Sequence, residues 1–144
     1  MQKDTKMALH RDEDTFLKET GKGFYNMFGI QMPDYRVDTY LQEGSLNINN
    51  TVMEIYHTPG HSPGSVSLYL PDSKTLIVGD VIFQAGVGRT DFPGGDGALL
   101  KKSIDKLSTL DIEYLLSGHG DIVKGADRVK RNFDYVAQVY YNSI

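Results

Sequence analysis

The chain has 144 residues and a mass of 16.1 kDa, and its 15 basic and 19 acidic side chains give a formal net charge of −4. A hydrophobic fraction of 40% at this length is typical of one globular domain and excludes a disordered or collagen-like chain. The acidic balance argues against a nucleic-acid partner, because phosphate binding needs basic residues. We expect a soluble, cytoplasmic protein without a membrane partner, since the sequence shows neither a long apolar run nor a signal peptide.

The first half of the chain predicts a helix and a hairpin. Acidic residues 12–14 favour the start of a helix, because they complement the positive end of the helix dipole. We expect this helix to stop near Gly21. A turn at residues 47–50 precedes residues 52–56, which are rich in β-formers, so two strands are predicted around it.

The second half alternates strands with helices. Residues 66–70 alternate with period two and residues 75–78 form a continuous apolar run, which predicts two strands. Apolar residues between 99 and 107 follow helical spacing, a short buried strand is expected at 114–116, and an amphipathic helix begins near Ala126. The fold class is therefore mixed α/β (α+β).

Three polar residues are predicted at the ends of strands. His61 lies in a Gly- and Pro-rich loop before a strand, Asp80 ends an apolar strand, and His119 follows another. Strand ends are where α/β proteins place their sites. The chain has no Cys, so a metal ion would need His, Asp or Glu as ligands. Each residue alone is explained equally well as a turn or capping residue, and only their agreement indicates a metal site.

The other candidate residues have simple structural interpretations. Pro59 and the following glycine break the helix that a His57-x-x-x-His61 zinc motif would need, so His57 is interpreted as a strand-end residue. His10 lies where a strand gives way to a helix. In the Gly-rich connection over 85–97, Arg89 and Asp91 are expected to form a local ion pair, with a substrate contact by Arg89 as the alternative.

With these residues in place, the sequence resembles the metallo-β-lactamase superfamily, in its glyoxalase II-like branch. The resemblance runs from about Met7 to about Val136. It is strongest in residues 57–65 (HTPGHSPGS), 78–80 (VGD) and 118–120 (GHG), and it continues through residues 88–96 (GRTDFPGGD).

The resemblance implies that His61, Asp80 and His119 are metal ligands, with the aspartate bridging two ions. Zinc is the usual metal in such proteins, two ions in the complete site, and iron or manganese occur in some. A metal-bound hydroxide then attacks the substrate, because the cation lowers the pKa of its water. No catalytic residue beyond these ligands is implied.

The sequence departs from the family pattern in one metal-ligand motif, and this changes what we expect of the domain and its activity. The His-x-His-x-Asp-His motif that supplies the other ligands is absent. We therefore expect residues 1–144 to be a single, N-terminally incomplete domain, the C-terminal two-thirds of an αββα sandwich. An uncovered sheet face over 66–70 and 76–78 would make the isolated chain marginally stable, homo-oligomeric or dependent on a complementing N-terminal partner.

The functional hypothesis is a metal-dependent hydrolase of a small ester or thioester, with this chain alone weakly active or inactive. One alternative is an enzyme similar to persulfide dioxygenases, which share the Gly-Arg-Thr-Asp-Phe stretch at 88–92 and use one iron. A second alternative is a non-catalytic remnant, or half of a split protein, acting as an interaction module.

Overall fold

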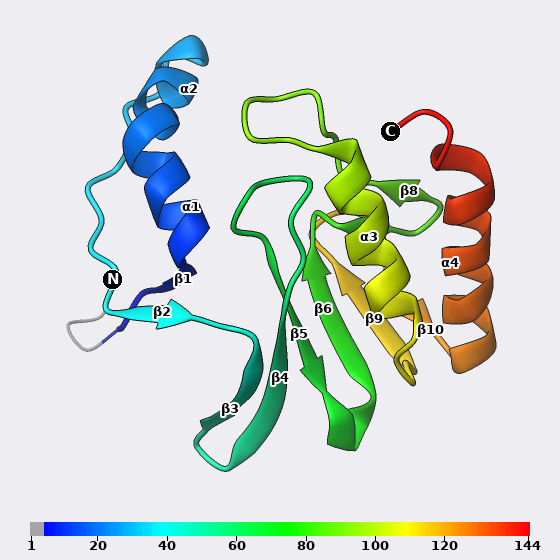
Figure 1. The fold of residues 1–144 in the computed structure, drawn as a ribbon. Coiled ribbons are helices and arrows are strands. Elements are labelled where there is room, and N and C mark those ends of the chain that lie inside the picture. Colours follow the sequence, from blue (N-terminus) through cyan, green and yellow to red (C-terminus); the bar gives the residue numbers. More distant parts are fainter. Residues whose placement is uncertain (1–4) are drawn as a thin grey trace.

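The computed structural model describes residues 5–144 and contains one mixed six-stranded sheet (Figure 1). Its strand order is β10-β9-β6-β5-β4-β3, and neighbours are antiparallel except for β6 and β9, which are parallel. β4, β6 and β9 therefore point the same way, and the loops that follow them lie at one edge. The strands are β3 (Gly44–Ile48), β4 (Thr51–His57), β5 (Val66–Leu70), β6 (Thr75–Gly79), β9 (Tyr114–Ser117) and β10 (Val123–Lys124).

Helices α3 (Gly97–Ser108) and α4 (Ala126–Tyr140) pack against this sheet and form the core with it (Figure 1). The Asp96 side chain caps α3 by accepting the N–H of Leu99 at 2.9 Å. Among the described residues, no helix combines the length and the apolar character needed to span a bilayer. The buried residues of this core include Leu76, Val78, Leu115, Leu100, Ile104, Leu107, Val129, Phe133 and Val136.

The N-terminal part forms a smaller unit beside the sheet. β1 (Ala8–His10) pairs in parallel with β2 (Thr39–Leu41), and α1 (Arg11–Phe16) begins directly after β1. The helix then continues through a π-helical turn (Leu17–Gly21) into α2 (Lys22–Met27), so the predicted stop near Gly21 is wrong. Gly21 keeps helical angles (φ −56°, ψ −44°) and is buried, with the Leu17 and Met32 side chains beside it.

Short elements complete the chain between β5 and α3. A 3₁₀ turn (Pro71–Ser73) connects β5 with β6. β7 (Ile82–Phe83) and β8 (Gly86–Val87) form a small antiparallel hairpin after the end of β6. The long connection that the sequence predicts over 85–97 therefore begins as a strand and then loops back over the sheet edge (Figure 1).

The second face of the sheet carries an apolar row. The strand register places Ile55, Leu68, Ile77 and Leu116 side by side on β4, β5, β6 and β9. Ile55 is buried, Leu68 and Leu116 are half-buried, and Ile77 is 39% exposed. The residues between them in each strand, such as Leu76, point to the other face of the sheet and pack in the core with α3 and α4. The predicted exposure of apolar residues on this face is thus observed at Ile77.

Candidate metal centre

The three predicted site residues lie together at the edge where β4, β6 and β9 end. Asp80 follows β6 directly, His119 lies two residues after β9, and His61 lies in the loop after β4. The Nε2 atoms of His61 and His119 each lie 3.5 Å from the same oxygen, Oδ2 of Asp80. Both imidazoles therefore approach one carboxylate from loops that are far apart in the sequence.

Backbone contacts fix the orientation of the His61 ring. Its Nδ1 lies 2.8 Å from the carbonyl oxygen of Arg89. Because a carbonyl oxygen only accepts, Nδ1 carries the proton and Nε2 presents its lone pair on the side of Asp80. Metal-binding histidines are commonly held in this way, with the second ring nitrogen donating to a carbonyl group.

The Arg89 side chain does not reach into the site. Its guanidinium donates two hydrogen bonds to the Asp91 carboxylate, at 2.8 and 2.7 Å, as the predicted ion pair requires. This pairing lowers the pKa of Asp91 to about 2. The ion pair therefore holds the loop whose backbone orients His61.

The Asp80 carboxylate is packed against glycine backbone. A Cβ atom on Gly118 would lie 2.2 Å from Oδ1 of Asp80, and one on Gly88 would lie 1.8 Å from the Asp80 carbonyl oxygen. The Gly118 N–H also donates to the carbonyl oxygen of Gly79 at 2.8 Å. Glycine is required at both positions because any side chain would displace the aspartate.

This donor set fits a divalent metal ion. Two imidazole nitrogens and one carboxylate oxygen are suitable ligands for zinc, iron or manganese in a chain without thiolates. Two ligands about 2.1 Å from a tetrahedral ion lie about 3.4 Å apart, close to the 3.5 Å between each imidazole and Asp80. The two imidazoles do not come within 4.8 Å of one another, so the set fits one histidine per ion with Asp80 between the ions. His119 is 74% exposed, so the site is open on that side.

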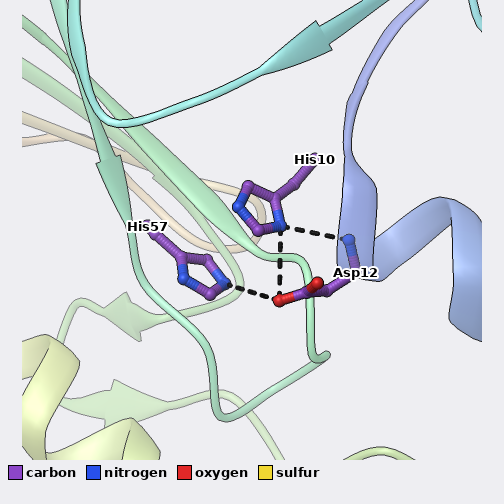
Figure 2. Close-up of side chains that lie close together, drawn as sticks. All are labelled: His10, Asp12 and His57. Carbon is purple, nitrogen blue, oxygen red and sulfur yellow. Dashed lines mark hydrogen bonds and ion pairs between the residues drawn. The ribbon is translucent and has the colours of Figure 1, made fainter.

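A second group of ligand-type atoms lies at the start of α1 (Figure 2). One atom each from His10, Asp12 and His57 lies within 4.8 Å of the others, and the two rings stack with centroids 4.0 Å apart. His10 Nδ1 accepts the backbone N–H of Asp12 at 3.2 Å, which caps α1, and His57 Nε2 donates to the carbonyl oxygen of Pro63 at 2.8 Å. Burial, and then the neighbouring His57, lower the pKa of His10. The ring stack and these hydrogen bonds support the structural roles predicted for both histidines.

Glu13 is a residue of the site that sequence reasoning missed. Its Oε2 accepts the Ser62 hydroxyl at 2.7 Å and the Gly64 N–H at 3.0 Å, which ties α1 to the loop of His61. The backbones come so close that a Cβ atom on Gly64 would lie 2.2 Å from the Glu13 nitrogen. The partners are about 50 residues apart, so the only local signal was the glycine itself.

The comparisons with known proteins agree with this fold. The family model described as the metallo-beta-lactamase superfamily matches residues 3–137, and the chain belongs to that superfamily. The sequence is 43% identical over 121 residues to the probable metallo-hydrolase YqgX of Bacillus subtilis, covering 81% of this chain and 57% of that protein. It is 37% identical over 118 residues to the hydroxyacylglutathione hydrolase GloC of Haemophilus influenzae, covering 76% and 54%.

Solved structures give the same fold. The crystal structure of TTHA1623 in a di-iron-bound form superposes with a TM-score of 0.72 at 30% identity, covering 94% of this chain and 63% of that chain. The metallo-β-lactamase fold expected from the sequence is thus confirmed. The chain spans a little more than half the length of the two curated relatives.

Proposed function

We propose that the chain carries part of the metal centre of a hydrolase acting on small esters or thioesters, with His61, Asp80 and His119 as the ligands. The observation that supports the proposal is the convergence of both Nε2 atoms on Oδ2 of Asp80 at 3.5 Å. The Asp80 carboxylate thus lies within 3.5 Å of one imidazole nitrogen from each histidine, which suits an aspartate that bridges two ions with one histidine on each. Membership of a superfamily of hydrolases supports the reaction class.

A bound divalent ion would supply a nucleophilic hydroxide near neutral pH and polarise the substrate carbonyl. The chain's own contribution is to hold the ligands His61 and Asp80 in position. The Arg89 carbonyl holds the proton of His61 on Nδ1, and Gly118 lets the Asp80 carboxylate approach closely. The open side next to His119 gives a substrate access to the site.

The substrate class and the metal rest on the similar proteins. GloC is named for a glutathione thioester, which supports a thioester substrate, and the di-iron form of TTHA1623 supports iron as an alternative to zinc. Three ligands shared between two ions leave each incompletely coordinated. We therefore propose that this chain alone is weakly active, and that a complementing segment supplies further ligands and covers the apolar row containing Ile77.

A thioesterase assay tests this proposal. The chain is loaded with zinc, iron or manganese and assayed on short acyl thioesters of glutathione, alone and together with the part of the Bacillus subtilis relative that it does not match. We expect weak hydrolysis alone, more with the added part, and none in either case for Asp80→Asn. Hydrolysis that survives both Asp80→Asn and a chelator would contradict the proposal.

One observation favours a second candidate. Two histidines and one carboxylate are also the ligand types of mononuclear iron oxygenases, and to share one ion the two imidazoles would have to move within 4.8 Å of each other. The stretch over 88–92 that resembles persulfide dioxygenases supplies the Arg89 carbonyl that orients His61. One iron per chain, with sulfite formed from glutathione persulfide, would favour this reaction over hydrolysis. Absence of any bound metal would instead favour a non-catalytic interaction module.

A further inference from the structure

A cavity of about 370 Å³ opens beside His61, between the N-terminal helices and the loop after β8. A volume of this size is in the usual range of small-molecule sites. His61 and Ser62 form its inner end, next to Asp80. Its remaining walls are mainly apolar, formed by Phe16, Leu17, Phe24, Phe28, Ile30 and Phe92.

The aromatic walls hold one another in place. The ring of Phe24 packs edge-on against Phe28 and against Phe92, each with centroids 5.2 Å apart. The guanidinium of Arg89 lies 3.4 Å from the centroid of the Phe92 ring on its face, and Asp91 fixes that guanidinium. The same loop thus orients both the candidate ligand His61 and a wall of the cavity.

The charge of the cavity limits what it can bind. Among the described residues that line it there is no Lys or Arg, and the one carboxylate is that of Glu13, which already accepts two hydrogen bonds. An anionic group, such as a glutathione carboxylate, would find no cation here. An uncharged apolar group would bury its surface against phenylalanine rings, which is favourable.

We propose that this cavity binds the apolar acyl or aryl group of the substrate, with the carbonyl carbon placed at His61, Asp80 and His119. The assignment rests on the proposed hydrolase function and adds the substrate class: esters or thioesters of apolar acids rather than of short hydroxy acids. Phe28 is 53% exposed and Ile30 is 56% exposed, so the cavity continues outward as an apolar rim that accommodates longer chains.

A binding series separates this inference from the hydrolase proposal. The probes are N-methyl butanamide, hexanamide and octanamide, which are neutral and resist hydrolysis, titrated into the metal-free chain and followed by amide NMR. We expect affinity to rise about threefold to fourfold per CH₂ group, with shifts at Phe24 and Phe92. In Phe28→Ala, which removes one half-exposed ring from the rim and leaves the inner apolar walls, the gain per CH₂ group should become smaller for the longest probe.

Tyr135→Ala is the matched control, because Tyr135 is an aromatic residue of α4, 46% exposed and outside the cavity. It should bind the series as the parent chain does. Equal affinities across the series, or the same loss in both variants, would overturn the inference even if the chain hydrolyses thioesters. If affinity rises with the acyl length of the probe but the protein neither binds metal nor hydrolyses thioesters, the result would support the cavity as a binding site and count against the hydrolase proposal.

Discussion

The carbonyl oxygen of Arg89 lies 2.8 Å from Nδ1 of His61, so the Gly-rich loop takes part in the site through its backbone. The Arg89 side chain turns the other way, to Asp91 and to the face of Phe92. This division explains why one loop can orient a candidate metal ligand and also form the wall of the neighbouring cavity. It also leaves no role for Arg89 as a free cation that contacts substrate.

Replacing Gly118 with alanine should weaken metal binding without unfolding the chain. The new Cβ atom would lie 2.2 Å from Oδ1 of Asp80, so the carboxylate must leave the position in which Oδ2 lies 3.5 Å from both imidazoles. We expect metal affinity to fall about 10- to 100-fold, the range found when the support of a ligand is removed. Isothermal titration with zinc measures it. Gly23→Ala is the control, since nothing lies within 4 Å of its Cβ position, and an equal loss there would contradict the explanation.

Glu13→Ala should destabilise the chain through the loop of His61. The change leaves the Ser62 hydroxyl and the Gly64 N–H without their acceptor, which we expect to lower the free energy of unfolding by about 1–3 kcal/mol. Urea unfolding followed by circular dichroism measures the difference. Glu19→Ala, at an exposed position of the adjoining π-helical turn, should change stability much less. Similar losses in the two variants would show that the hydrogen bonds of Glu13 contribute nothing specific.

Stability should fall in acid through Asp14. Hydrogen bonds from Lys18 (2.7 Å) and then Tyr40 (2.6 Å) lower the pKa of this carboxyl below its usual 3.8. A carboxyl whose pKa is lower in the folded state stabilises fully above the unfolded value, and this contribution is lost as pH falls through the folded value. We therefore expect stability to decrease as pH falls below about 3.8, and less steeply in Asp14→Asn. Urea midpoints between pH 2 and 6 test this, with the exposed Asp34→Asn keeping the parent slope.

The apolar row on the second sheet face should cause self-association. Ile77 is 39% exposed there and lies beside Leu68 and Leu116. Ile77→Thr keeps a β-branched residue in the strand but removes apolar surface, so we expect weaker association in sedimentation equilibrium. Ile122→Thr, at a 60% exposed position outside the row, is the control. A parent chain that stays monomeric and melts cooperatively at high temperature would refute the idea.

The sequence predicted strands that end at Asp80 and near His119, and the family resemblance grouped these residues with His61. The structure adds the strand directions: β4, β6 and β9 run the same way, so the loops that carry the three residues share one edge. The 3.5 Å separations between side chains were not predictable, since they depend on glycine contacts such as that of Gly118 with Asp80.

Other features depend on contacts that no local pattern shows. The alternation of apolar and polar residues over 66–70 correctly predicted a strand. The buried residues of that strand, however, are Ser67 and Tyr69, and its aliphatic residues are only half-buried. Ser67 is within hydrogen-bond distance of the Thr58 hydroxyl, and Tyr69 donates to the carbonyl oxygen of Asp111, so both polar groups are satisfied inside. The helix end near Gly21 was wrong because the backbone keeps helical angles through this buried glycine, next to Leu17 of the same helix and Met32 of the following segment, despite its low helix propensity.

Metal titration of the chelator-stripped chain shows whether His61, Asp80 and His119 hold metal, when the parent is compared with Asp80→Asn and Asp12→Asn. The two variants remove one carboxylate from each of the two histidine-containing groups. We expect weak binding of fewer than two ions per chain, lost in Asp80→Asn and retained in Asp12→Asn. Binding that is lost in Asp12→Asn but retained in Asp80→Asn, or two tightly bound ions per parent chain, would contradict this expectation.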